Sequence, residues 1–133
     1  MILIDTSAIF AVLDKDDINH TRAAKLWTEL IENETPILTN SNLLLEAFAL
    51  IQRRHGLDIL SRFQQSMVPW LEIEWIDSEK HIQAVNLLLS VNRRYLSLVD
   101  ISAFATMRRT GVNQVFTFDN HFAEEGFTVL PDA

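Results

Sequence analysis

The sequence predicts a single α/β domain, a three-layer α/β/α sandwich with a central, mainly parallel sheet. Short apolar runs alternate along the chain with longer segments whose apolar residues recur at helical spacing, and this alternation is typical of parallel strands joined by helical crossovers. The chain has 133 residues, of which 48% are hydrophobic, with three Gly and three Pro. That size and composition indicate one compact domain over residues 1–133.

The predicted strands are short and apolar. Residues 1–4 form the unbroken run MILI, which is typical of a strand buried on both faces. Residues 71–76 alternate apolar and polar side chains, which favours a strand with one polar face. The remaining predicted strands span residues 36–39, 115–118 and 128–130.

Helices are predicted between these strands. Ser41 or Asn42 is expected to cap a strongly apolar helix that ends near His55, because Gly56 follows as a plausible stop. The other predicted helices cover residues 7–13, 20–32, 57–66, 78–91 and 98–109.

The composition narrows the range of functions. The absence of cysteine excludes disulfides and thiolate metal sites, so any metal must be bound by oxygen or imidazole ligands. The N-terminus lacks the cationic segment and cleavage site of a signal peptide. The densest apolar stretch, residues 43–51, is far shorter than a membrane span. We therefore expect a soluble cytoplasmic protein.

The net charge of −7 argues at face value against nucleic-acid binding, because phosphate contacts need Lys and Arg. Six of the eleven basic residues, however, form three pairs near the ends of predicted helices: Arg53-Arg54, Arg93-Arg94 and Arg108-Arg109. A cation at a helix C-terminus also favours the helix dipole, so helix-end solvation is an alternative for every pair. The first two pairs are our candidate RNA contacts.

Two acidic residues follow predicted strands directly. Asp5 comes after residues 1–4, and Asp119 comes after residues 115–118. Ligands of parallel sheets bind beyond the carboxyl ends of the strands, so both acids are expected at a site. The alternatives are an ordinary turn at Asp5 and a helix cap at Asp119.

Two further acids lie in predicted helices. Glu46 interrupts an apolar helix, where an unpaired buried carboxylate costs several kcal/mol. Glu46 is therefore expected to meet a cation or a cleft, unless it lies on an exposed edge or pairs with an Arg. Ser97 and Asp100 match the capping-box pattern. Asp100 can act as that cap, as a metal ligand, or as both.

The chemistry of a metal site explains why several acids would converge. Carboxylates that gather without a cation repel one another, whereas Mg²⁺ takes oxygen ligands. A bound metal also lowers the pKa of a coordinated water and neutralises charge that develops on a phosphate. None of the histidines shows zinc-ligand spacing, and His121, close to Asp119, is a weaker candidate for the same site.

Several segments together resemble a known family. The order and spacing of these segments make the chain similar to PIN-domain nucleases, and specifically to the small stand-alone members known as VapC toxins of toxin–antitoxin pairs. The segments are IDTSA at 4–8, NLLLE at 42–46, SLVDISA at 97–103, FTFDNHF at 116–122 and GFTVLP at 126–131.

The resemblance implies an active site made of Asp5, Glu46, Asp100 and Asp119, with Thr6 supplying a nearby hydroxyl. It also implies Mg²⁺- or Mn²⁺-dependent cleavage of RNA, a homodimer, and inhibition by a cognate antitoxin protein. The sequence leaves two other functions open. One is a catalytically silent domain that binds RNA or a protein through the same groove, and the other is a structure-specific DNA nuclease.

Overall fold

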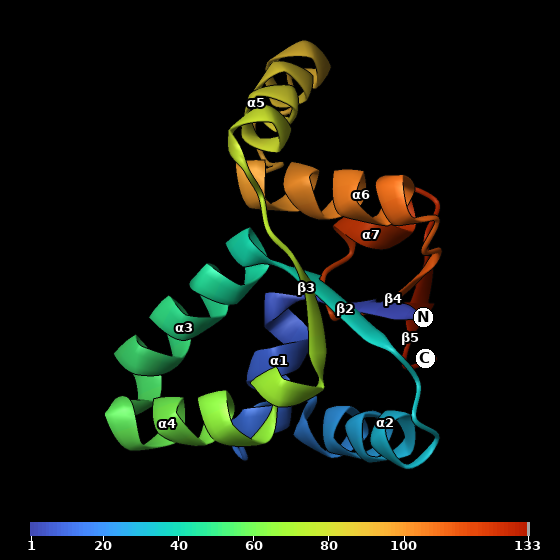
Figure 1. The fold of residues 1–133 in the computed structure, drawn as a ribbon. Coiled ribbons are helices and arrows are strands. Elements are labelled where there is room, and N and C mark those ends of the chain that lie inside the picture. The colour runs from blue at the N-terminus through green and yellow to red at the C-terminus, as the bar shows by residue number, and fades with distance from the viewer. Residues whose placement is uncertain (133) are drawn as a thin grey trace.

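In the computed structural model, which describes residues 1–132, five parallel strands form one sheet in the order β3-β2-β1-β4-β5 (Figure 1). The central strand β1 pairs with both β2 and β4. The prediction of a parallel central sheet is therefore confirmed. The strands are β1 (Ile2–Ile4), β2 (Ile37–Asn40), β3 (Leu71–Glu74), β4 (Gln114–Phe116) and β5 (Thr128–Leu130).

Helices cover both faces of this sheet (Figure 1). Alternate side chains of β1 point to opposite faces: Ile2 and Ile4 join one hydrophobic cluster, and Leu3 joins the other. Helices α1 to α4 pack mainly on the first cluster, and α5 to α7 on the second. The three-layer prediction is confirmed. The helices are α1 (Thr6–Leu13), α2 (His20–Glu32), α3 (Ser41–His55), α4 (Leu57–Ser66), α5 (Ser78–Val91), α6 (Leu98–Thr110) and α7 (His121–Glu124), with a 3₁₀ turn at Val68–Trp70.

Two strands end earlier than predicted. β4 stops at Phe116, and the backbone N–H of Phe118 donates to the Ser7 hydroxyl at 2.9 Å. β3 stops at Glu74, and the N–H of Ile76 donates to the Ser41 hydroxyl at 2.8 Å. In both cases a side-chain acceptor replaces the strand ladder, which the apolar pattern alone does not reveal.

Helix starts also differ from the prediction. Asn40 caps α3, in place of Ser41 or Asn42, because its Oδ1 accepts from the N–H of Leu43 at 2.8 Å. A four-residue helix, α7, follows Asp119, and its N-cap is Asn120 rather than Asp119. Among residues 1–132, no helix combines the length and the apolar character that crossing a bilayer requires.

A buried polar network fixes α6 against the sheet. The amide of Asn40 donates to the hydroxyl of Thr106 at 3.1 Å, and that hydroxyl donates to Glu74 at 2.7 Å. Arg109, at the other end of α6, also binds Glu74. Partial burial opposes ionisation of Glu74, but the hydrogen bonds from Arg109 and Thr106 prevail and lower the pKa of this carboxyl. This network ties α6, and with it Asp100, to β2 and β3.

Candidate functional site

Asp5 lies at the carboxyl end of β1, where only 4% of its surface is exposed. It caps α1, and its Oδ1 accepts from the Ser7 hydroxyl at 2.7 Å and from the N–H of Ala8 at 3.1 Å. Its Oδ2 accepts from the Thr117 hydroxyl at 2.7 Å. Three donors therefore hold both oxygens of a buried carboxylate in a fixed orientation.

Burial raises the pKa of Asp5 to about 6. The hydrogen bonds from Thr117, Ser7 and Ala8 oppose this shift, and the negative charge of Asp119 adds to it. At neutral pH the Asp5 carboxyl therefore carries a charge that its surroundings disfavour. A cation held by Asp119 would offset the repulsion between these two carboxylates.

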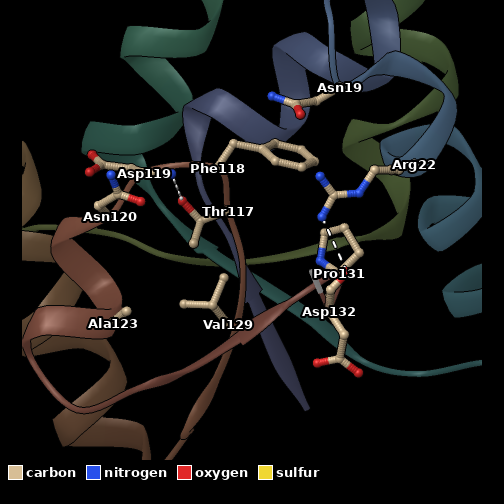
Figure 2. Close-up of a pocket in the computed structure, with 10 residues that line it drawn as sticks. All are labelled: Asn19, Arg22, Thr117, Phe118, Asp119, Asn120, Ala123, Val129, Pro131 and Asp132. Atoms are coloured by element: carbon tan, nitrogen blue, oxygen red, sulfur yellow. Dashed lines mark hydrogen bonds between the residues drawn. The ribbon is translucent and has the colours of Figure 1, made fainter.

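Asp119 lies in the loop between β4 and α7. Its N–H donates to the Thr117 hydroxyl at 2.9 Å (Figure 2). Its Oδ1 accepts from the N–H of His121 at 2.9 Å. The hydroxyl of Thr117 thus orients two acids at once, Asp5 through a side-chain hydrogen bond and Asp119 through its backbone.

Asp100 performs the helix-capping role that its spacing predicted. Its Oδ2 accepts from the N–H of Ser97 at 3.0 Å, while its own N–H donates to the Ser97 hydroxyl at 3.0 Å. The same Oδ2 lies 3.5 Å from Nδ1 of His121. Asp100 therefore both caps α6 and faces the other site residues.

The acids of α6 and of the β4–α7 loop meet around His121. One ligand atom each from Asp100, Asp119 and His121 lies within 4.8 Å of the others. Nδ1 of His121 is 3.3 Å from Oδ1 of Asp119, yet it is buried and has no hydrogen-bond partner among the described residues. Carboxylate oxygens with an imidazole nitrogen form a donor set that divalent cations accept. These residues fit a metal ion.

Glu46 is exposed on α3, so the expectation that its carboxylate is buried is wrong. The apolar sequence around it includes Leu45, which is 70% exposed, and apolar residues are common on protein surfaces. Glu46 lies on the exposed edge that the alternative interpretation described. It borders a small hollow together with Leu98 and Val99, the residues just before Asp100.

The hydroxyl group next to the Asp5 carboxylate is not that of Thr6, as expected, but those of Ser7 and Thr117. The Thr6 hydroxyl donates to the carbonyl oxygen of Leu43 at 3.1 Å, which ties α1 to α3. Ser7 and Thr117, instead, contact the Asp5 carboxylate directly. Thr117 was not among the site residues predicted from the sequence, although it lies at a strand end, two residues before Asp119.

The candidate RNA contacts are dispersed. Arg53 and Arg54 are exposed in the last turn of α3, at the opposite end from its cap Asn40, and Arg54 lies over the Phe10 ring. Arg94 is exposed in the α5–α6 loop. Arg93 pairs with two glutamates of the α7 region, at 3.5 Å and 3.4 Å. The structure brings none of these arginines into the cluster of Asp100, Asp119 and His121.

The sequence profile of the PIN domain matches residues 2–127. The chain belongs to the PIN-domain family. The resemblance seen in the sequence is confirmed, and the carboxylates described above lie within the matched range.

This PIN domain has relatives that it matches over nearly their full length. It is 30% identical over 131 residues to VapC20 of Mycobacterium tuberculosis, a 23S rRNA-specific endonuclease, and the match covers 96% of this chain and 95% of that protein. The crystal structure of VapC20, described as a Sarcin-Ricin loop cleaving toxin, superposes with a TM-score of 0.82 at 27% identity and covers 96% of this chain and 97% of that one. The structure of FitAcB from Neisseria gonorrhoeae, at 18% identity and a TM-score of 0.70, covers 98% and 97% and shares the fold.

Proposed function

We propose that this PIN domain is a metal-dependent endoribonuclease that hydrolyses RNA phosphodiester bonds and acts as the toxin of a toxin–antitoxin pair. The observation that carries the proposal is the convergence of Asp100, Asp119 and the unpartnered His121 nitrogen beside the buried carboxylate of Asp5. RNA as the substrate is supported by the 30% identity to VapC20, whose name specifies cleavage of 23S rRNA.

Asp5, Asp100 and Asp119 would hold Mg²⁺ or Mn²⁺, and Glu46 would be a further ligand or would orient a coordinated water. When bound, such a cation supplies a water of lowered pKa and neutralises charge on the reacting phosphate. The chain contributes orientation, since Thr117 and Ser7 fix Asp5 and the α6 cap fixes Asp100. Thr6 would support this arrangement only through its contact with α3.

The decisive experiment measures RNA cleavage in Mg²⁺ or Mn²⁺, with and without EDTA. Asp5→Asn and Asp119→Asn are each expected to lower kcat by at least about 100-fold, because each removes a charge that helps to bind the metal. Asp16→Asn, at an exposed acid outside the site, is the matched control and should cleave like the wild type. Cleavage that persists in EDTA, or full activity in Asp5→Asn, would refute the mechanism.

The same assay separates the two other functions. A catalytically silent binding domain would bind RNA without turnover and would retain binding in Asp100→Asn. A structure-specific DNA nuclease would cut flap DNA in preference to single-stranded RNA or tRNA, so a panel of these three substrates distinguishes it.

We further propose that residues 1–133 act as one nuclease domain, in the cytoplasm, as a homodimer controlled by an antitoxin. The description of VapC20 as a toxin supports the proposal that an antitoxin controls this chain. The expected partner is a small protein encoded next to this chain, which should copurify with it and abolish cleavage. A neighbouring protein that binds without lowering the cleavage rate would contradict this role.

A further inference from the structure

A hollow of about 480 Å³ lies beside the candidate metal site (Figure 2). Its walls come from the start of α2 with Asn19 and Arg22, from residues 117–120, from α7, and from β5 with the residues that follow it. Asp119 lines the hollow and also belongs to the acidic cluster. A molecule in this hollow would therefore lie next to Asp119, at the edge of the candidate metal site.

The loop between the hollow and the site is firmly held. The N–H of Phe118 donates to the Ser7 hydroxyl at 2.9 Å, and the N–H of Asp119 donates to the Thr117 hydroxyl at 2.9 Å. These are the two hydroxyls that also bind the Asp5 carboxylate. The wall of the hollow and the orientation of the site acids therefore depend on the same hydrogen bonds.

Arg22 is the only basic residue among those that line the hollow in the described chain. Its guanidinium donates to the carbonyl oxygen of Asp132 at 3.2 Å and lies 5.6 Å from the centre of the Phe118 ring. The Asp132 carboxylate points away from it (Figure 2).

Arg22 also forms no ion pair with any described Asp or Glu, whereas Arg93, Arg108 and Arg109 all pair with glutamates. Among residues 1–132, therefore, no carboxylate lies within ion-pairing distance of Arg22, whose guanidinium lines the same hollow as Asp119.

We propose that this hollow binds the nucleotide adjacent to the cleaved bond of a single-stranded RNA, with Arg22 contacting the phosphate next to the scissile one. The inference rests on the proposed ribonuclease function. The scissile phosphate would be neutralised by the metal, whereas the next phosphate along the RNA would need a positive charge supplied by the protein. An arginine can supply this charge, because the N–H groups of its planar guanidinium match the spacing of phosphate oxygens. Contact with the Phe118 ring holds the Arg22 guanidinium in place.

The rest of the lining suits a nucleotide. Asn19 and Asn120 present amide groups, which both donate and accept hydrogen bonds as base edges and ribose hydroxyls do. Asn19 also marks the N-terminal end of the 13-residue helix α2, whose dipole favours a nearby anion.

The first test compares Arg22→Ala with Arg62→Ala, which removes an equally charged, exposed side chain from α4. Arg22→Ala should lower kcat/KM on a single-stranded oligoribonucleotide by about 10-fold to 100-fold, as expected for one charge-assisted phosphate contact. In EDTA, where no turnover occurs, it should also reduce the slope of log affinity against log salt by about 0.7. Arg62→Ala should change neither quantity, and Arg22→Lys should keep most of the salt slope.

The second test locates the contact on the RNA. Phosphates that flank the cleaved bond are replaced one at a time by neutral methylphosphonates. One of these replacements should slow the wild type but have no further effect in Arg22→Ala. Equal melting temperatures of the variants show that the fold is intact.

The two proposals fail in different ways. A wild type that binds RNA without cleaving it overturns the ribonuclease function, while the salt slope in EDTA still tests Arg22. If Arg22→Ala binds and cleaves RNA as Arg62→Ala does, the nucleotide subsite is overturned, and the hollow is left for a protein partner. The nucleotide subsite is also overturned if every methylphosphonate replacement slows cleavage by Arg22→Ala as much as it slows cleavage by the wild type.

Discussion

At the scale of single residues, the ionisation of Asp5, a residue of the candidate site, affects the free energy of unfolding. Its pKa of about 6 lies above the ordinary value of 3.8, so the folded chain binds this proton more tightly than the unfolded chain does. The resulting stabilisation is fully present below pH 3.8 and is lost as the pH rises through about 6. Without a metal, ionised Asp5 therefore destabilises the protein at neutral pH.

Asp5→Asn should accordingly stabilise the metal-free protein. In EDTA at pH 7.5, we expect its free energy of unfolding to exceed that of the wild type by about 1 to 3 kcal/mol, and the difference should nearly vanish at pH 4. Urea denaturation at both pH values measures this. Added Mg²⁺ should raise the melting temperature of the wild type but not of the variant. A variant less stable than the wild type at pH 7.5 would contradict the argument.

Thr117→Val tests how the site acids are oriented. It leaves Oδ2 of Asp5 without its donor and the N–H of Asp119 without its acceptor, so the pKa of Asp5 should rise further. We expect kcat to fall by about 10-fold to 100-fold, and the acidic limb of the pH–rate profile to move to higher pH.

The matched control for that variant is Thr39→Val. Thr39 is equally buried, but its hydroxyl donates to the carbonyl of Ile4 at 3.2 Å and, within residues 1–132, forms no hydrogen bond with a carboxylate. It should lower stability by about 1 kcal/mol without moving the pH profile. If both variants shift the profile, or neither does, Thr117 does not act through Asp5.

At the scale of elements, the cap at the start of α6 contributes both to the stability of the fold and to the position of Asp100, a proposed metal ligand. Ser97→Ala removes the hydroxyl that accepts from the N–H of Asp100, which should cost about 1 kcal/mol and loosen the Asp100 carboxylate. We therefore expect a higher Mg²⁺ concentration for half-maximal cleavage.

Asp77→Ala provides the comparison, because Asp77 caps α5 by accepting from the N–H of Lys80 at 2.9 Å. It should cost a similar free energy of unfolding and leave the Mg²⁺ dependence unchanged. An equal Mg²⁺ dependence in Ser97→Ala and the wild type would show that the cap does not position Asp100.

The elements also show what the sequence can and cannot predict. Strand ends locate Asp5 and Asp119 because all strands of a parallel sheet end at one edge. The part played by Thr117 depends on the pairing of β1 with β4, which joins residues more than a hundred positions apart. The exposure of Glu46 depends on which side of α3 packs against its neighbours. Helix α7 has four residues, too few to produce a periodic pattern.

At the scale of the whole molecule, apolar groups are exposed near the start of α3 and α6. Leu45 is 70% exposed and lines a hollow of about 250 Å³ with Ala49, Leu98 and Val99. The polar residues Asn42, Glu46 and His81 complete its lining. Apolar surface that gathers around a hollow is characteristic of protein interfaces. This surface supports the proposed homodimer, since a second copy of the chain would cover it.

Leu45→Lys tests that arrangement, because a charge at a buried apolar contact weakens association strongly. The wild type should elute as a dimer in size-exclusion chromatography with light scattering, and the variant should raise the dissociation constant at least about 10-fold. Leu57→Lys is the control, since Leu57 is 67% exposed and lies at the far end of α3, at the start of α4. It should remain dimeric. A monomeric wild type, or a Leu45→Lys variant as dimeric as Leu57→Lys, would mean that this surface does not join two copies.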